Sequence, residues 1–164
     1  MTGHVAVIAD THMPRGARRL PESCVARLHA ADLILHAGDL VAASVLEELA
    51  ALGPPLHAVH GNMDDAELQQ SLPETLVVDA AGLRIGMTHD PGPRAGREER
   101  LAQRFPGCAA VVYGHTHEPQ VERVGKTWIL NPGSPTERRR SPVHTMLVLE
   151  VPGDQIRPEL IRLD

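Results

Sequence analysis

Aromatic residues are almost absent from this chain of 164 residues, in which Phe105, Tyr113 and Trp128 are the only three. Proteins that read single-stranded nucleic acid stack its bases on aromatic side chains, so this scarcity argues against a binding surface of that kind. The core must instead be built from Val, Leu, Ile and Ala. A hydrophobic share of 42% is enough for that, because it is ordinary for a globular protein.

Cysteines and long apolar runs are also scarce. Cys24 and Cys108 are too few and too far apart for a disulfide framework or a cysteine metal site, and we expect both to be buried thiols. No stretch reaches the run of about 18 apolar residues that a membrane span requires. The chain opens directly on a strand-like run, which leaves no room for a signal peptide. These absences predict a cytoplasmic protein with no membrane partner.

An excess of positive charge is missing as well, since the formal net charge is -5. No global field therefore attracts the protein to nucleic acid, and a long nucleic acid is not expected as a partner. Arginines do cluster locally, in residues 15–19, 94–104 and 138–140. Taken alone, each cluster is most simply a solvated face.

The pattern of apolar runs predicts an α/β protein. Strands are expected at residues 5–9, 33–36, 56–60, 74–79, 83–88, 109–113, 120–124, 127–130, 144–151 and 155–163. Helices are expected at residues 19–30, 43–52 and 94–104. Strands and helices alternate in the first half, which indicates a parallel sheet, whereas the tail reads as antiparallel strands. The length suits one domain over residues 1–164, with two packed sheets and helices on their outer faces.

Potential metal ligands follow five of the expected strands, at the point where each strand ends. In chain order they are Asp10, His12, Asp39, Asn62, His89, His115 and His117. Loops at the carboxyl ends of strands in an open α/β sheet converge on one crevice, so we expect these side chains to lie together. Taken singly, each has an ordinary alternative as a helix cap, a turn residue or a hydrogen-bonded histidine. Their joint placement at five strand ends is what indicates a site.

The chemistry of these residues points to metal ions. Carboxylate, imidazole and amide donors suit Mn, Fe, Zn or Ni, and the absence of thiolates disfavours a structural zinc site. Seven donors are too many for one ion with an open position, but they suit two ions about 3.5–4 Å apart that share a carboxylate. Two divalent ions, two aspartates and one hydroxide leave a charge of about +1, which favours an anionic phosphoryl group. The residues therefore predict a binuclear centre that attacks phosphate esters.

The ordered blocks resemble the five-block signature of the calcineurin-like metallophosphoesterase superfamily: Asp10-x-His12, Gly38-Asp39, Gly61-Asn62, His89 and Gly114-His115-x-His117. Spacing and size are similar to its small bacterial and archaeal phosphodiesterase branch, to which a retromer subunit is related. Asn131-Pro132-Gly133-Ser134 matches a late motif of that branch, so the resemblance covers nearly the whole chain. It implies a four-layer αββα sandwich of two mixed β-sheets flanked by helices.

The resemblance also implies a role for each ligand. Asp10, His12 and His117 would hold the first ion. Asn62, His89 and His115 would hold the second, with Asp39 bridging the two. Asp39, Asn62 and His115 are the implied catalytic residues, and a metal-bridging hydroxide would attack phosphorus in line with the leaving group. We expect two divalent ions, Mn first, with Ni, Fe or Zn as alternatives.

Two positions depart from the family pattern. Many relatives have a histidine directly after the asparagine, where this chain has Met63, and a second histidine two residues after His89, where it has Pro91. No obvious general acid remains. We therefore expect substrates with good leaving groups or a metal-assisted departure.

Arg15, Arg138 and Arg139 are candidate substrate contacts, because a planar guanidinium can hold a phosphate with two hydrogen bonds. The leading hypothesis is a phosphodiesterase that acts on a small phosphodiester. The alternative is a metal-binding scaffold or protein-interaction module with little or no catalysis, like the retromer relative. A scaffold is free to lose ligands, so the seven present here favour the enzyme. A homodimer is suggested only by the base rates of oligomer symmetry.

Overall fold

The computed structural model describes residues 2–13, 16 and 18–163, and its first sheet has the strand order β10-β9-β1-β2-β3. Its members are β1 (Thr2–Ile8), β2 (Leu33–His36), β3 (Leu56–Ala58), β9 (Thr145–Pro152) and β10 (Arg157–Arg162). The three strands from the first half of the chain pair in parallel, whereas β9 and β10 add antiparallel strands at one edge. The sheet is therefore mixed.

The second sheet is also mixed, with the order β4-β5-β6-β8-β7. Its members are β4 (Thr75–Ala80), β5 (Leu83–Thr88), β6 (Ala110–Val112), β7 (Gln120–Val124) and β8 (Thr127–Asn131). The central strands β5, β6 and β8 are parallel, and an antiparallel strand lies at each edge.

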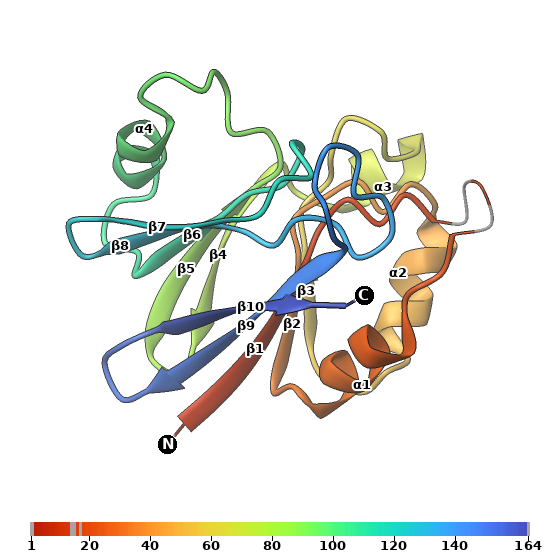
Figure 1. The fold of residues 1–164 in the computed structure, drawn as a ribbon, viewed down its shortest axis with the longest axis horizontal. Helices are drawn as coiled ribbons and strands as arrows, with labels where there is room; N and C mark the ends of the chain where they lie inside the picture. The colour runs from red at the N-terminus through yellow and green to blue at the C-terminus, as the bar shows by residue number, and fades with distance from the viewer. Residues whose placement is uncertain (1, 14–15, 17, 164) are drawn as a thin grey trace.

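Helices cover the outer faces of both sheets, as Figure 1 shows. They are α1 (Glu22–Ala30), α2 (Ala43–Ala50), α3 (Ala66–Ser71) and α4 (Arg97–Arg104). The first two pack on the first sheet and α4 on the second. This arrangement confirms the predicted four-layer αββα sandwich. No helix in the described part of the chain is long and apolar enough to cross a membrane.

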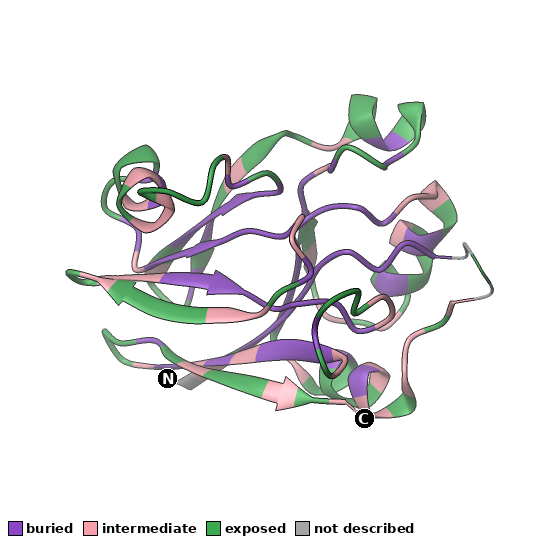
Figure 2. Cartoon of the chain, turned by 45° about the horizontal axis from the view of Figure 1, so that its top comes forward, coloured by how far each residue is buried: buried purple, intermediate pink, exposed green. Residues whose placement is uncertain are grey.

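The core follows from the two-residue period of the strands. In β1, Val5 and Val7 face the second sheet, whereas Ala6 and Ile8 face α1 and α2. The same alternation in β6 turns Val111 toward α4. Figure 2 shows the result, with buried residues concentrated in the central strands and exposed residues on the outer helices. Both cysteines are buried and unpaired, as predicted.

The structure differs from the predicted elements mainly at their ends. The helix α3 was not predicted, because it is short and buries only Leu68; Asp65 caps its first turn by accepting a hydrogen bond from the Leu68 N–H at 2.9 Å. The helix predicted over 19–30 begins after Pro21, which is its N-cap. The helix predicted over 94–104 begins after Gly96, whose φ of 67° is left-handed. These local backbone constraints shorten both helices.

Candidate metal centre

The seven predicted ligands come together where loops from both sheets meet. The first sheet contributes Asp10, His12, Asp39 and Asn62, which follow β1, β2 and β3, and the second contributes His89, His115 and His117, which follow β5 and β6. Asp10, His12, Asp39, His89 and His117 are buried, whereas His115 is half-buried and Asn62 is exposed. The site therefore lies at the seam between the sheets.

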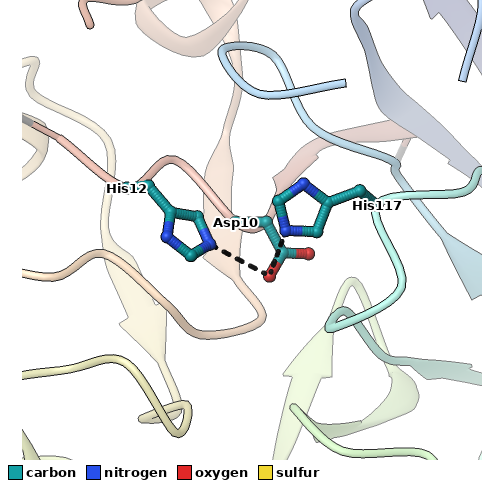
Figure 3. A group of neighbouring side chains, drawn as sticks. All are labelled: Asp10, His12 and His117. Carbon is teal, nitrogen blue, oxygen red and sulfur yellow. Dashed lines mark ion pairs between the residues drawn. The ribbon is translucent and has the colours of Figure 1, made fainter. Parts of the chain in front are cut away.

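Three of these residues form one compact group, drawn in Figure 3. Asp10 Oδ1 lies 3.9 Å from His12 Nε2 and 3.6 Å from His117 Nε2. All three atoms are buried, and none has a hydrogen-bond partner among the described residues. Buried polar atoms without partners are rare in native proteins, so a shared ligand is the natural explanation for three in one place. Two imidazole nitrogens and a carboxylate oxygen fit a divalent cation.

A second group, which could also hold an ion, consists of Asp10, Asp39 and His89. Asp39 Oδ2 lies 3.2 Å from His89 Nε2 and 3.4 Å from His12 Nε2, so it stands between the two groups. Asn62 Oδ1 lies 3.1 Å from the same His89 nitrogen. The His115 ring meets the His89 ring edge-on, with 5.3 Å between their centroids.

Backbone carbonyls orient two of the imidazoles. His89 Nδ1 donates a hydrogen bond to the Ala37 carbonyl oxygen at 2.8 Å. His117 Nδ1 donates to the Glu137 carbonyl oxygen. Each bond places the proton on Nδ1 and leaves Nε2 facing the centre, which is the usual arrangement of a metal-binding histidine.

The electrostatics of the site favour positive charge. Burial alone would lower the pKa of His89, but the Asp39 hydrogen bond and the charges of Asp10 and Asp39 raise it to about 9. Burial opposes ionisation of Asp39, yet the contact with His89 holds the pKa of that carboxyl below its usual value. A proton on His89 thus neutralises carboxylates that a metal cation could neutralise instead.

The backbone at this site is left-handed at five of the seven predicted ligands. The φ angles are 56° at Asp10, 47° at His12, 61° at Asp39, 75° at His115 and 63° at His117. For a residue other than glycine this conformation costs about 1–2 kcal/mol. Such outliers cluster at functional sites, where the surrounding structure enforces them.

Glycines give the ligands the space they need. Gly38 has a φ of 100°, and a Cβ there would lie only 2.6 Å from His89 Nδ1. A Cβ on Gly61 would collide with the Asp39 carboxylate. The glycine beside each of these two ligand loops therefore permits a close approach that a side chain would block.

Asp64 holds two of the ligand loops together, a role that the sequence did not reveal. Its Oδ2 accepts hydrogen bonds from the backbone N–H groups of Asp39 at 3.0 Å and Gly61 at 2.7 Å. Its Oδ1 accepts from the Val41 N–H at 2.7 Å. The position of Asp64, two residues after Asn62, was the only available signal, and turn residues of that kind are common.

Glu137 and Ser134 support the first group from the loop after β8. Glu137 Oε2 lies 3.6 Å from His12 Nδ1, and its Oε1 accepts a hydrogen bond from Arg18 Nη2 at 3.0 Å. Ser134 Oγ donates to the Asp10 carbonyl oxygen at 2.8 Å and accepts from the Glu137 N–H at 2.8 Å. The Asn131–Ser134 motif therefore brings residues 134–137 against the loop that carries Asp10 and His12. Nothing in the local sequence marks Glu137, because the fold alone creates its contact with His12.

The predicted arginine contacts fall in three different situations. Arg15 lies outside the described residues. Arg138 is exposed, and its Nη1 donates to the Pro142 carbonyl oxygen at 2.8 Å. Arg139 is exposed and lines a cavity of about 590 Å³ beside Thr116, the residue between His115 and His117. A substrate contact by Arg139 stays a prediction.

Comparison with known proteins identifies the family. A model described as the calcineurin-like phosphoesterase superfamily domain matches residues 4–154. The chain belongs to this superfamily. The metallophosphoesterase fold together with the candidate ligand groups indicates that this calcineurin-like chain binds divalent metal.

Individual relatives agree with this assignment. A probable metallophosphoesterase of Methanothermobacter thermautotrophicus is 34% identical over 160 residues, covering 96% of this chain and 91% of the relative. The phosphodiesterase MJ0936 of Methanocaldococcus jannaschii is 27% identical over 113 residues, covering 62% of this chain and 66% of the relative. The structure of vacuolar protein sorting 29 from Cryptosporidium parvum superposes with a TM-score of 0.86 at 24% identity, covering 99% of this chain and 92% of the other. That last likeness shows the fold alone.

Proposed function

We propose that the protein is a binuclear metal-dependent phosphodiesterase. The observation that carries the proposal is the trio of buried ligand atoms on Asp10, His12 and His117, none of which has a hydrogen-bond partner among the described residues. Asp39 Oδ2 lies between this trio and His89. Relatives named metallophosphoesterase and phosphodiesterase support a phosphate ester as the substrate.

In this proposal Asp10, His12 and His117 would hold one ion and Asn62, His89 and His115 the other, with the Asp39 carboxylate placed between the two sets. When bound, the two ions supply a hydroxide nucleophile and neutralise the charge of the phosphoryl group. The mixture of oxygen and nitrogen donors favours Mn, while Ni, Fe and Zn also suit it.

The protein's own contribution is to hold the donor atoms in place. The carbonyl oxygens of Ala37 and Glu137 hold His89 and His117 in place. Met63, beside Asn62, is 36% exposed and cannot donate a proton to a leaving group. The expected substrates are therefore diesters whose leaving alcohol has a low pKa. A series of aryl diesters with leaving groups of increasing pKa should show steeply falling rates, and a flat dependence would contradict this.

The direct test is hydrolysis of bis-p-nitrophenyl phosphate and p-nitrophenyl phosphate by metal-stripped protein, with Mn, Ni, Zn or Mg added back. We expect Mn to restore cleavage of the diester and Asp39→Ala to lower it by at least about a hundredfold. Asp154→Ala, which removes an exposed carboxylate in the β9–β10 turn, is the matched control and should keep full activity. Elemental analysis should find two ions per chain in the control protein.

The second candidate function is a metal-binding scaffold with little or no catalysis, and the absence of a proton donor at Met63 is the feature that favours it. The same experiment separates the two. A folded protein that binds two ions per chain and cleaves neither ester with any metal would establish the scaffold.

We also propose that the protein acts in the cytoplasm as a homodimer. Two free thiols, Cys24 and Cys108, suit a reducing compartment. The homodimer rests on base rates, and light scattering of the purified protein would decide it.

A further inference from the structure

A cavity of about 590 Å³ lies beside the metal centre, and none of the seven predicted ligands lines it. Its walls come from the start of α4, from the end of β6 with the loop that follows, from β7, and from the loop after β8. Thr116, which stands between His115 and His117 in the chain, is part of the wall. The cavity therefore borders the loop that carries His115 and His117.

Four arginines line the cavity: Arg94, Arg97, Arg139 and Arg140. Thr116 and Glu118, which flank His117 in the chain, share this wall with the arginines. Positive charge is thus placed along the loop that carries two of the predicted ligands.

Three of these four arginines have side chains available to a ligand. Arg97 is partly occupied, since its Nη2 donates to the Gly92 carbonyl oxygen at 3.0 Å and its guanidinium lies 5.7 Å from the centroid of the Tyr113 ring. Arg94, Arg139 and Arg140 are exposed, and the described residues offer their side chains no hydrogen bond or ion pair. Exposed guanidinium groups of this kind are suited to carboxylates and phosphates.

Three glutamates share the wall, namely Glu98, Glu118 and Glu122. A hydrogen bond from its own backbone N–H and one from Gln120 Nε2 at 2.8 Å hold the pKa of Glu98 below its usual value, and the charges of Arg97 and Arg94 add to this effect. Four arginines against three glutamates leave one net positive charge on the wall. Glu98 interacts with Arg94 and Arg97 and not with Arg139 and Arg140.

The backbone of Arg139 adds an independent observation. Its φ is 49°, a left-handed conformation that costs a residue other than glycine about 1–2 kcal/mol. A strained backbone at an exposed charged residue beside a cavity is typical of a functional position.

We propose that this arginine-lined cavity binds a second anionic group of the substrate. On this view, which rests on the proposed phosphodiesterase function, the natural substrate is a small organic phosphodiester in which one ester group carries a further carboxylate or phosphate. The metal centre holds the phosphoryl group that reacts, and Arg139 and Arg140 bind the additional anion.

The test compares two diesters that share the same leaving group, p-nitrophenyl phenyl phosphate and p-nitrophenyl 3-carboxyphenyl phosphate. For the Mn-loaded protein we expect KM to be about five- to tenfold lower for the carboxylated diester. One charge-assisted hydrogen bond between its carboxylate and an arginine would strengthen binding by about that factor. The double variant Arg139→Gln/Arg140→Gln should reduce this preference to less than about twofold. Arg157→Gln, which removes an exposed arginine on β10, is the charge-matched control and should keep the preference.

A binding measurement separates this proposal from the proposed function. Metal-free protein carrying Asp39→Asn is titrated with each diester and followed by NMR. Preferential binding of the carboxylated diester that the arginine variant abolishes would support the cavity even if the Mn-loaded protein cleaved neither compound. Cleavage of both diesters with equal KM, or a preference that survives in the double variant, would overturn the cavity proposal and leave the phosphodiesterase intact.

Discussion

At the scale of single residues, the left-handed backbone of the metal centre sets a conflict between stability and function. His117 has a φ of 63°, which glycine adopts without cost, yet only a side chain can supply a donor atom. Position 117 therefore keeps a histidine in a strained backbone conformation because the imidazole supplies a donor atom.

This conflict predicts an unusual order of stability among variants. In metal-free protein, His117→Gly should be more stable than His117→Ala by about 1 kcal/mol, because alanine keeps the left-handed strain and glycine relieves it. At His89, which has no positive φ, the order should reverse by about 0.5–1 kcal/mol. Urea denaturation of the four variants measures both differences. If the alanine variant were more stable than the glycine variant at both positions, the backbone strain at residue 117 would be absent.

At the scale of elements, Asp64 connects the loop after β2 to the loop after β3. The variant Asp64→Asn keeps the shape but replaces one carboxylate oxygen with an N–H donor that faces backbone N–H groups. We expect the free energy of unfolding to fall by about 1–3 kcal/mol. We also expect metal affinity to fall about 10- to 100-fold.

The control for this prediction is Asp79→Asn. Asp79 also accepts a backbone hydrogen bond, from the Gly82 N–H at 3.0 Å, but in an exposed hairpin away from the metal centre. Calorimetric metal titration and urea denaturation of both variants compare the two carboxylates. Equal losses of metal affinity would mean that Asp64 does not organise the ligand loops.

Most elements could be predicted because their signals are local. The strand Leu33–His36 was predicted with its observed bounds, since four consecutive buried residues form a pattern that needs no tertiary information. The helix α3 was missed, because six mostly polar residues carry no periodic apolar face. The observed ends of elements differ from the predicted ones where a single residue such as Gly96 changes the direction of the backbone.

The residues of the site likewise divide into those that the sequence could predict and those that it could not. The seven residues that the fold brings together could be singled out because each lies in a loop that follows a strand and each is a residue type that binds metal. Their role as ligands stays a prediction. The supporting residues Asp64 and Glu137 could not, because their contacts join loops far apart in the sequence and follow only from the packing of two sheets.

At the scale of the whole molecule, one buried histidine is expected to make stability depend on pH. His36 is fully buried, its Nδ1 accepts a hydrogen bond from the Gly38 N–H at 3.1 Å, and its Nε2 lies 3.1 Å from Thr11 Oγ1. Burial, together with the positive charge of His89, lowers the pKa of His36 from 6.5 to about 3. The folded protein therefore keeps the ring neutral, whereas the unfolded chain takes up a proton below pH 6.5.

The stability associated with His36 is full above about pH 6.5 and is lost progressively as the pH falls toward 3. Between pH 7.5 and pH 5.5 the loss should be about 1.4 kcal/mol. The variant His36→Asn keeps a side-chain oxygen that can accept the hydrogen bond from the Gly38 N–H. Urea denaturation should show that its free energy of unfolding falls by about 1.4 kcal/mol less than that of the unmodified protein over this pH range. His57→Asn, which changes an exposed histidine in β3, is the control, and an unchanged pH dependence in His36→Asn would refute the assignment.

The position of the centre at the seam between the sheets has a mechanical consequence. Each proposed ligand set draws on both sheets, since Asp10 and His12 follow β1 while His117 follows β6, and Asn62 follows β3 while His89 follows β5. A shear of one sheet across the other would separate the donors of both sets at once, so bound ions would act as additional cross-links between the two layers. Chelation should therefore accelerate amide hydrogen exchange in β1 and β5 together, on the two faces of the same interface.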